Sequence, residues 1–178
     1  MRTPGERTVR AAAAMLGIAA VVGVLALAVC HPPARAGDPC GAPDARIVVD
    51  TAGHRLALCD HEKETATFGV RIGRGGVGKS KEGDDKTPLG IYPLGVPRKS
   101  QRYGTFIPIG YPTPEQQKRG FTGGSIGVHG PERLVRWMGS LVNTFDSTSG
   151  CVGIATDDEM AKIAAWVKAA SVKTIELR

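Results

Sequence analysis

Short segments rich in apolar and β-branched residues, often alternating with polar ones, recur along the chain and predict β-strands. Residues 46–50 and 55–59 have this character on either side of a Thr-Ala-Gly turn, and so predict a hairpin. Residues 64–72 continue the pattern and predict a third strand. After a loop rich in glycine and charge, the pattern returns in residues 125–129 and 172–177. These segments indicate a mainly β fold.

Residues 86–94 have a similar character, but two prolines interrupt them. Because proline cannot donate a backbone hydrogen bond, Pro88 and Pro93 restrict this segment to a sheet edge or to a strand broken by a turn.

Two capping signals predict short helices. Thr113 is followed by Pro114 and then by Gln116, a pattern that predicts a helix ending near Arg119. Residues 156–159, Thr-Asp-Asp-Glu, form a second capping box. The apolar residues that follow it at helical spacing are Met160, Ile163, Ala164 and Val167.

Composition supports one turn-rich domain. The chain has 178 residues, of which 42% are hydrophobic, which suffices for one ordinary core. It contains 24 glycines and 12 prolines and only 5% aromatic residues, which argues against a helical bundle or coiled coil. We expect a short linker at residues 37–45 and a single folded domain at residues 46–178.

The first 36 residues have the composition of a secretory signal. Three arginines lie in residues 1–10, and residues 11–30 carry no charge. Ala34 and Ala36 offer the small side chains that signal peptidase requires, so we expect cleavage after Ala36. An uncleaved membrane anchor is the alternative, because 20 uncharged residues can span a bilayer. Both interpretations place the folded domain in the periplasm or cell envelope.

The net charge of the remaining residues is small. The whole chain carries +6, and residues 37–178 carry 19 basic and 16 acidic side chains, or +3. Nucleic-acid binding requires clustered basic residues, and this excess is dispersed. We therefore expect no nucleic-acid partner, and membrane contact only through an uncleaved N-terminal segment.

The cysteines separate into a predicted pair and a single thiol. Cleavage after Ala36 would remove Cys30. Cys40 and Cys59 flank the predicted hairpin and are the plausible disulfide in an oxidising compartment. Cys151 is then left without a partner.

Residues 73–80, Gly-Arg-Gly-Gly-Val-Gly-Lys-Ser, match the pattern of a nucleotide phosphate loop. Such a loop needs a helix that begins at Lys79, and Gly83 and Pro88 prevent one. We therefore predict a flexible, solvated loop and no nucleotide cofactor. His54 and His61 lack the spacing of metal ligands, so no metal is expected either.

Cys151 and His129 are the candidate catalytic residues. Cys151 lies in a turn of small residues, and His129 ends a predicted strand. An adjacent imidazole can lower the pKa of a thiol from about 8.5 and make it nucleophilic. The backbone amides of Gly150 and Cys151 could form an oxyanion hole. The alternative is a buried structural thiol and an unrelated surface histidine.

An ordered set of motifs resembles a known family. Residues 83–92, Gly-Asp-Asp-Lys-Thr-Pro-Leu-Gly-Ile-Tyr, are followed by Ile-Gly-Val-His-Gly at 126–130 and Ser-Gly-Cys-Val at 149–152. Together with the opening strands, the chain from Arg46 to Leu177 resembles the YkuD-type L,D-transpeptidases, which remodel bacterial peptidoglycan.

The resemblance implies a β-sandwich with mixed sheets and two or three short helices. It implies that Cys151 is the nucleophile, that His129 is the general base and acid, and that the Gly130 carbonyl orients the histidine. The substrates would be peptidoglycan stem peptides, with a second stem or an envelope protein as acceptor, and no cofactor would be needed. With water as acceptor the enzyme would be an L,D-carboxypeptidase or hydrolase; a non-catalytic peptidoglycan-binding module is a third possibility.

Two positions depart from the family pattern. Ser149 stands where the family often has His or Arg, and Gly153 stands where it often has Arg or Asn. Because a guanidinium that could bind a carboxylate is absent at position 153, either another residue holds the substrate or the preferred substrate differs. The candidate substrate-binding residues are Arg74, Lys79, Lys81, Thr148 and Ser149.

Overall fold

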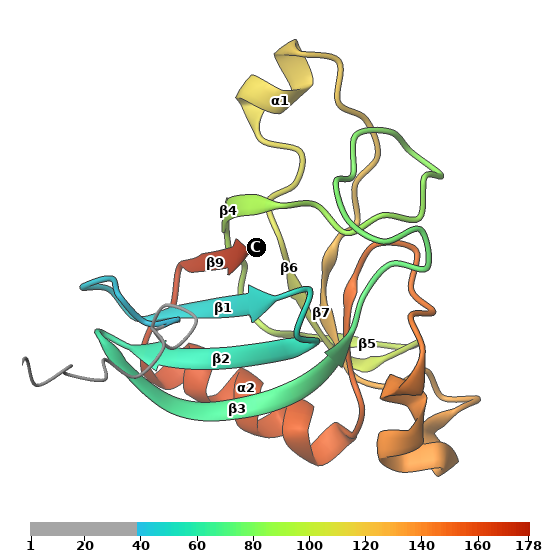
Figure 1. Ribbon diagram of the computed structural model, residues 1–178. Coiled ribbons are helices and arrows are strands. Elements are labelled where there is room, and N and C mark those ends of the chain that lie inside the picture. The colour runs from blue at the N-terminus through green and yellow to red at the C-terminus, as the bar shows by residue number, and fades with distance from the viewer. Residues whose placement is uncertain (1–38) are drawn as a thin grey trace, which may run out of the picture. The chain divides into compact units, whose positions relative to one another are not determined.

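The computed structural model describes residues 39–178, shown in colour in Figure 1. The predicted signal peptide, residues 1–36, and its cleavage site lie outside this range. None of the helices in residues 39–178 is long and apolar enough to cross a membrane.

The described residues form a mixed sheet in the order β4-β9-β1-β2-β3-β8-β7-β6-β5. The strands are β1 (Arg46–Asp50), β2 (Arg55–Asp60), β3 (Lys63–Arg71), β4 (Gly90–Pro93), β5 (Arg98–Ser100), β6 (Gly104–Pro108), β7 (Gly127–His129), β8 (Val152–Ile154) and β9 (Thr174–Leu177). β1 is parallel to β9 and β7 is parallel to β8, while the other neighbours are antiparallel.

β3 joins the two halves of this sheet. Most of it pairs with β2, and its last two residues, Val70 and Arg71, pair with Ile154 and Gly153 of β8. Figure 1 shows the long β3 arrow curving from its place beside β2 toward β7. The fold is therefore mainly β with mixed strand pairing, as predicted, and one continuous strand links the two halves of a single curled sheet.

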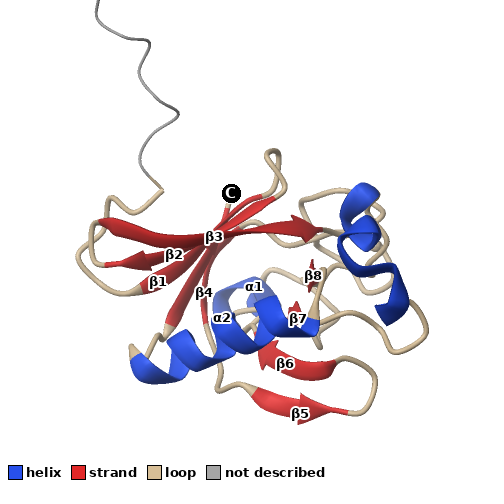
Figure 2. Ribbon diagram, turned by 90° about the horizontal axis from the view of Figure 1, so that it is seen from below, coloured by secondary structure: helices blue, strands red, loops and turns tan. Residues whose placement is uncertain are grey.

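The helices within residues 39–178 are α1 (Pro114–Lys118), the 3-10 helix η1 (Arg136–Thr144) and α2 (Asp157–Ala169). Both predicted capping boxes are present, at Thr113 with Gln116 and at Thr156 with Glu159. α2 contacts β6 and β8, and Figure 2 shows it lying across the strands. Its side chains that enter the main core are Met160, Ile163, Ala164 and Val167, as the periodicity predicted.

Several elements had no clear signal in the sequence. β5 and β8 have only three residues each, and β5 is largely exposed, so neither shows a usable period. η1 contains a non-helical residue, Gly139, with a φ of 55°, and carries exposed apolar side chains. Those of η1 are Trp137 and Leu141, and Leu134 and Phe145, just outside it, are exposed as well.

A disulfide joins Cys40 to Cys59, as predicted from their position around the hairpin. It packs with Val48 and Ala57 in a small cluster separate from the main core. The bond fixes the segment that precedes β1 against β2. Cys151 is the free cysteine of the described residues.

Candidate active site

Three neighbouring strands place one residue each in a row across the sheet. His129 of β7 lies opposite Gly153 of β8, and Gly153 lies opposite Arg71 of β3. Because side chains alternate along a strand, these positions share one face of the sheet. Their neighbours Val128 and Val152 point to the other face and belong to the main core.

Cys151 lies on the same face as this row. It precedes β8 directly and is two residues before Gly153. Its thiol donates a hydrogen bond to the carbonyl oxygen of Ser125, with a sulfur–oxygen distance of 3.5 Å. Cys151 and His129 both line a cavity of about 450 Å³. The structure therefore brings together the two residues that the sequence singled out.

The ring of His129 is buried and held in one orientation. Its Nδ1 lies 2.7 Å from the carbonyl oxygen of Gly130. Because a carbonyl can only accept a hydrogen bond, Nδ1 carries the proton and Nε2 keeps its lone pair in the neutral ring. Tyr103 stacks on the ring with a centroid distance of 3.8 Å, and Phe106 lies almost parallel to it at 6.4 Å.

Burial favours the neutral forms of both groups. It lowers the pKa of His129 to about 4 and raises the pKa of the Cys151 thiol. The N–H of Gly127 opposes the effect at the sulfur, because it stabilises the thiolate. The sequence predicted an imidazole that keeps the sulfur ionised. Burial of both groups opposes that ionisation, and a neutral imidazole with a free Nε2 is suited to take the thiol proton during attack.

The turn before Cys151 is organised by a threonine hydroxyl. Thr148 Oγ1 donates to the carbonyl oxygen of Cys151 at 2.7 Å and accepts the N–H of Gly150 at 3.1 Å. The Gly150 amide is thus engaged within the turn, and its oxyanion role stays a prediction. Ser149 is exposed and lines the cavity together with Thr148.

Gly150 itself is required by its surroundings. Its φ of +114° is unfavourable for other residues, and a Cβ atom there would lie 2.5 Å from the Lys86 carbonyl oxygen. The loop of residues 73–87 therefore contacts the turn that carries the thiol.

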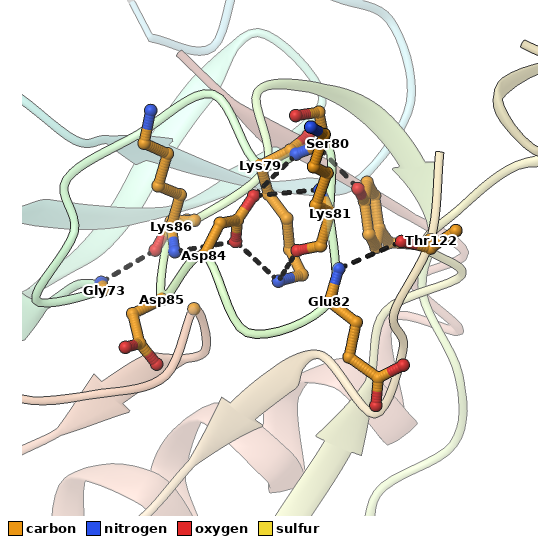
Figure 3. A network of polar contacts seen from close by, with 12 residues as sticks. Gly73, Lys79, Ser80, Lys81, Glu82, Asp84, Asp85, Lys86 and Thr122 are labelled. Atoms are coloured by element: carbon orange, nitrogen blue, oxygen red, sulfur yellow. Dashed lines mark hydrogen bonds and ion pairs between the residues drawn. The ribbon is translucent and has the colours of Figure 1, made fainter. Parts of the chain in front are cut away.

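Lys79 does not reach the cavity, in contrast to its predicted role in substrate binding. Its Nζ lies 2.8 Å from Asp84 and donates to the Lys81 carbonyl at 3.1 Å (Figure 3). Asp84 also accepts the N–H groups of Ser80, Lys81 and Lys86. Although its partial burial opposes ionisation, these donors hold the pKa of Asp84 well below its ordinary value. The loop is thus held together by internal hydrogen bonds, while most of its residues from 74 to 83 are exposed, as expected of a solvated loop.

The other two basic candidates differ from each other. Arg74 lines the cavity, and its guanidinium is paired with Asp85 at 2.7 Å. Lys81 is exposed and does not line the cavity, which argues against its predicted substrate contact. Beyond Ser80 the backbone forms turns instead of the helix that a phosphate loop requires.

Several residues of the cavity were not predicted. Arg71, Arg102 and Glu132 supply charge, and Tyr103 supplies the ring that stacks on His129. A further wall comes from apolar side chains of residues 135–145, in and next to η1. Of these, only Arg71 had a signal, as a charged residue within a predicted strand. No cluster of three His, Cys, Asp or Glu side chains suited to a metal occurs in residues 39–178.

Comparison with known proteins identifies the family. The family model for the YkuD L,D-transpeptidase catalytic domain matches residues 44–175. No match was found among curated proteins.

Two solved structures illustrate the shared fold. The helical cell shape determining protein Pgp2 from Campylobacter jejuni is 24% identical, with a TM-score of 0.63, and the match covers 80% of this chain and 52% of that one. Bd1075 from Bdellovibrio bacteriovorus is 23% identical, with a TM-score of 0.55, over 77% of this chain and 48% of that one. This chain thus spans about half of each solved structure. With the match to the family model over nearly all described residues, the chain belongs to the YkuD family of L,D-transpeptidase catalytic domains.

Proposed function

We propose that this protein is a peptidoglycan L,D-transpeptidase that forms a thioester between Cys151 and a tetrapeptide stem. The observation that carries this proposal is that a free thiol and a buried, oriented imidazole line one cavity, the imidazole on β7 and the thiol on the residue directly before β8, which is parallel to β7. Membership of the family supports the same chemistry. In this proposal residues 46–178 are the catalytic domain.

In the first half-reaction, His129 Nε2 takes the thiol proton as Sγ attacks the carbonyl carbon of the L-centred stem residue, typically diaminopimelate. The carbonyl oxygen gains negative charge, and the Cys151 N–H is the donor that we assign to it. The bond to the terminal D-alanine nitrogen then breaks. His129 returns its proton to that nitrogen, D-alanine leaves, and a thioester remains.

In the second half-reaction, the amine of another stem or of an envelope protein attacks the thioester. His129 accepts the amine proton and then gives it to the leaving sulfur. A new amide bond forms and the free thiol is restored. The Gly130 carbonyl keeps the same nitrogen of His129 available in both steps, because it fixes the proton on Nδ1. The predicted export signal fits this reaction, because peptidoglycan lies outside the cytoplasm.

The test is mass spectrometry of tetrapeptide-bearing muropeptides incubated with the full chain, with Cys151→Ala as the control. Cross-linked dimers together with free D-alanine, formed by the wild type alone, support the proposal. Tripeptides without dimers would replace it with the hydrolytic reaction, in which water is the acceptor. Unchanged muropeptides and no thioester on Cys151 would contradict catalysis and favour the peptidoglycan-binding alternative.

A further inference from the structure

Arg71 is a buried basic side chain without an acidic partner. It is only 3% exposed. Its Nη1 makes two long contacts, 3.3 Å to Asn143 Oδ1 and 3.4 Å to the Ile154 carbonyl oxygen. No carboxylate of residues 39–178 forms an ion pair with it. Buried charges in proteins are normally paired, so this guanidinium calls for a partner from outside the chain.

The absence of a side chain at Gly153 leaves room for the side chain of Arg71 to cross the sheet. A Cβ atom at position 153 would lie 2.8 Å from Cγ, Nε and Cζ of Arg71. The arginine therefore lies flat over β8, in the space that a side chain at position 153 would fill. From there it lines the same cavity as His129 and Cys151.

The other arginines of the cavity are already neutralised. Arg74 pairs with Asp85, and Arg102 pairs with Glu132 at 2.8 Å. Their side chains are 57% and 67% exposed, so water screens their charge. Arg71 is the cavity guanidinium of the described residues that is both shielded from water and free of a carboxylate.

We propose that Arg71 binds a carboxylate of the substrate and thereby positions the scissile bond beside Cys151. The proposal rests on the proposed function, because the substrate is taken to be a stem peptide. A planar guanidinium can bind a carboxylate through two parallel hydrogen bonds, which fixes orientation as well as position. Stem peptides with diaminopimelate carry two such groups near the scissile bond, the terminal carboxylate and the side-chain carboxylate.

The first experiment measures binding without turnover. The full chain carrying Cys151→Ala is titrated calorimetrically with three tetrapeptides: the free acid, the terminal carboxamide and the side-chain carboxamide. We expect one amide to bind about 10- to 100-fold more weakly than the acid, and Arg71→Met to abolish that difference. The amide that loses affinity identifies the carboxylate. Equal affinities for all three peptides, or an acid preference that survives Arg71→Met, would overturn the proposal.

Arg98→Met is the matched control. Arg98 occupies the same cross-strand row, opposite Phe106, but lies over that ring at 5.0 Å and does not line the cavity. Its substitution should leave the acid preference unchanged. Because the titration needs no reaction, acid-specific binding by a protein that forms no thioester would contradict the proposed function alone.

The second experiment moves the guanidinium. Gly153→Arg alone should weaken acid binding, because the new side chain collides with Arg71. Arg71→Ala alone should weaken it about 10- to 100-fold. The double variant Arg71→Ala with Gly153→Arg should recover most of the acid preference, because the new arginine occupies the emptied space. A folded double variant that binds acid and amide equally would show that the guanidinium is not the carboxylate ligand.

Discussion

Within residues 39–178, one arginine and one lysine are almost fully buried, and their surroundings differ. Lys79, in the loop of residues 73–87, is 5% exposed and its ammonium is paired with Asp84. Arg71, at the end of β3, is 3% exposed and has no carboxylate partner among the described residues. Lys79 serves the stability of a loop that contacts the thiol turn, whereas Arg71 faces a cavity that a substrate can enter.

This contrast distinguishes charged groups that stabilise the fold from charged groups that are available to bind a ligand. When one residue of a buried ion pair is mutated, the charge of the other is left buried without a partner, which destabilises the folded state. An unpaired charge beside a cavity contributes little to folding and gains its partner only on binding. Substitutions in the loop should therefore reduce stability, and substitutions in the cavity should reduce reaction or binding.

The largest effect is expected for His129→Gln, on the cavity side of the comparison. Without the imidazole no group takes the thiol proton, so the rate of thioester formation should fall about 1000-fold, or about 4 kcal/mol. Glutamine can still donate to the Gly130 carbonyl, so the free energy of unfolding should fall by only about 1 kcal/mol. Acylation followed by mass spectrometry and denaturant unfolding measure the two quantities. A rate within tenfold of the wild type would contradict the role of His129.

The next effect is expected for Asp84→Asn, on the loop side. This change leaves the buried ammonium of Lys79 without its counter-charge, and the free energy of unfolding should fall by about 3–4 kcal/mol. The double variant Lys79→Met with Asp84→Asn removes the stranded charge and should regain part of the loss. Denaturant titration at neutral pH measures both. A single variant as stable as the wild type would mean that the ion pair is not structural.

A third prediction is that the cavity and the loop lose stability in different pH ranges. The pKa of His129 is about 4 in the folded protein and about 6.5 when the chain is unfolded, so the unfolded chain binds more protons between these values. The contribution of His129 to the free energy of unfolding is fully present above pH 6.5. It should fall by about 3 kcal/mol as the pH is lowered to about 4. The pKa of Asp84 is lowered from 3.8, so its contribution should disappear only at lower pH.

The measurement is denaturant unfolding across this pH range, with His129→Gln as the matched control. The difference in stability between wild type and variant should change between pH 6.5 and pH 4. A difference that is independent of pH would show that the imidazole titrates normally in the folded protein. The acid limb of the reaction rate should likewise lie near pH 4, since neutral His129 is the proposed base.

Much of the sheet was predictable, because its longer strands show their period in the sequence. Residues 46–50 and 64–72 correspond closely to β1 and β3, and both capping boxes marked real helices. β8 was not predicted because three residues, Val-Gly-Ile, carry no period. Its pairing with β7 and β3 comes from long-range contacts that local sequence does not encode.

The site, like the sheet, was predictable only where local sequence carries the information. Cys151 and His129 could be found because each lies in a motif, and the Gly130 carbonyl lies beside Nδ1 where the family resemblance implied it. Of the predicted substrate-binding residues, Arg74, Thr148 and Ser149 line the cavity, whereas the ammonium of Lys79 is paired with Asp84. Arg71 was overlooked because its relevance depends on the register that sets it against Gly153.

The smallest effect is expected for Arg71→Met, and it tests the comparison most directly. Methionine fills much of the space of the arginine stem over Gly153 and removes a buried charge that has no acidic partner. The free energy of unfolding should therefore stay within about 1 kcal/mol of the wild type or rise. Lys79→Met, which leaves Asp84 without its cation, should lose about 3 kcal/mol under the same conditions.

Binding of a tetrapeptide should reveal an effect of Arg71 on stability that the unliganded protein does not show. A tetrapeptide acid at 100 times its dissociation constant should stabilise a protein that binds it by about 2.7 kcal/mol, because it binds only the folded state. In the Cys151→Ala background, the protein with Arg71 should show this gain and the Arg71→Met variant should show much less at the same peptide concentration. Thermal unfolding with and without the peptide measures the difference. If Arg71→Met instead destabilised the unliganded protein as much as Lys79→Met does, the two long contacts of Arg71 would be structural, and the distinction between paired and unpaired cations would fail.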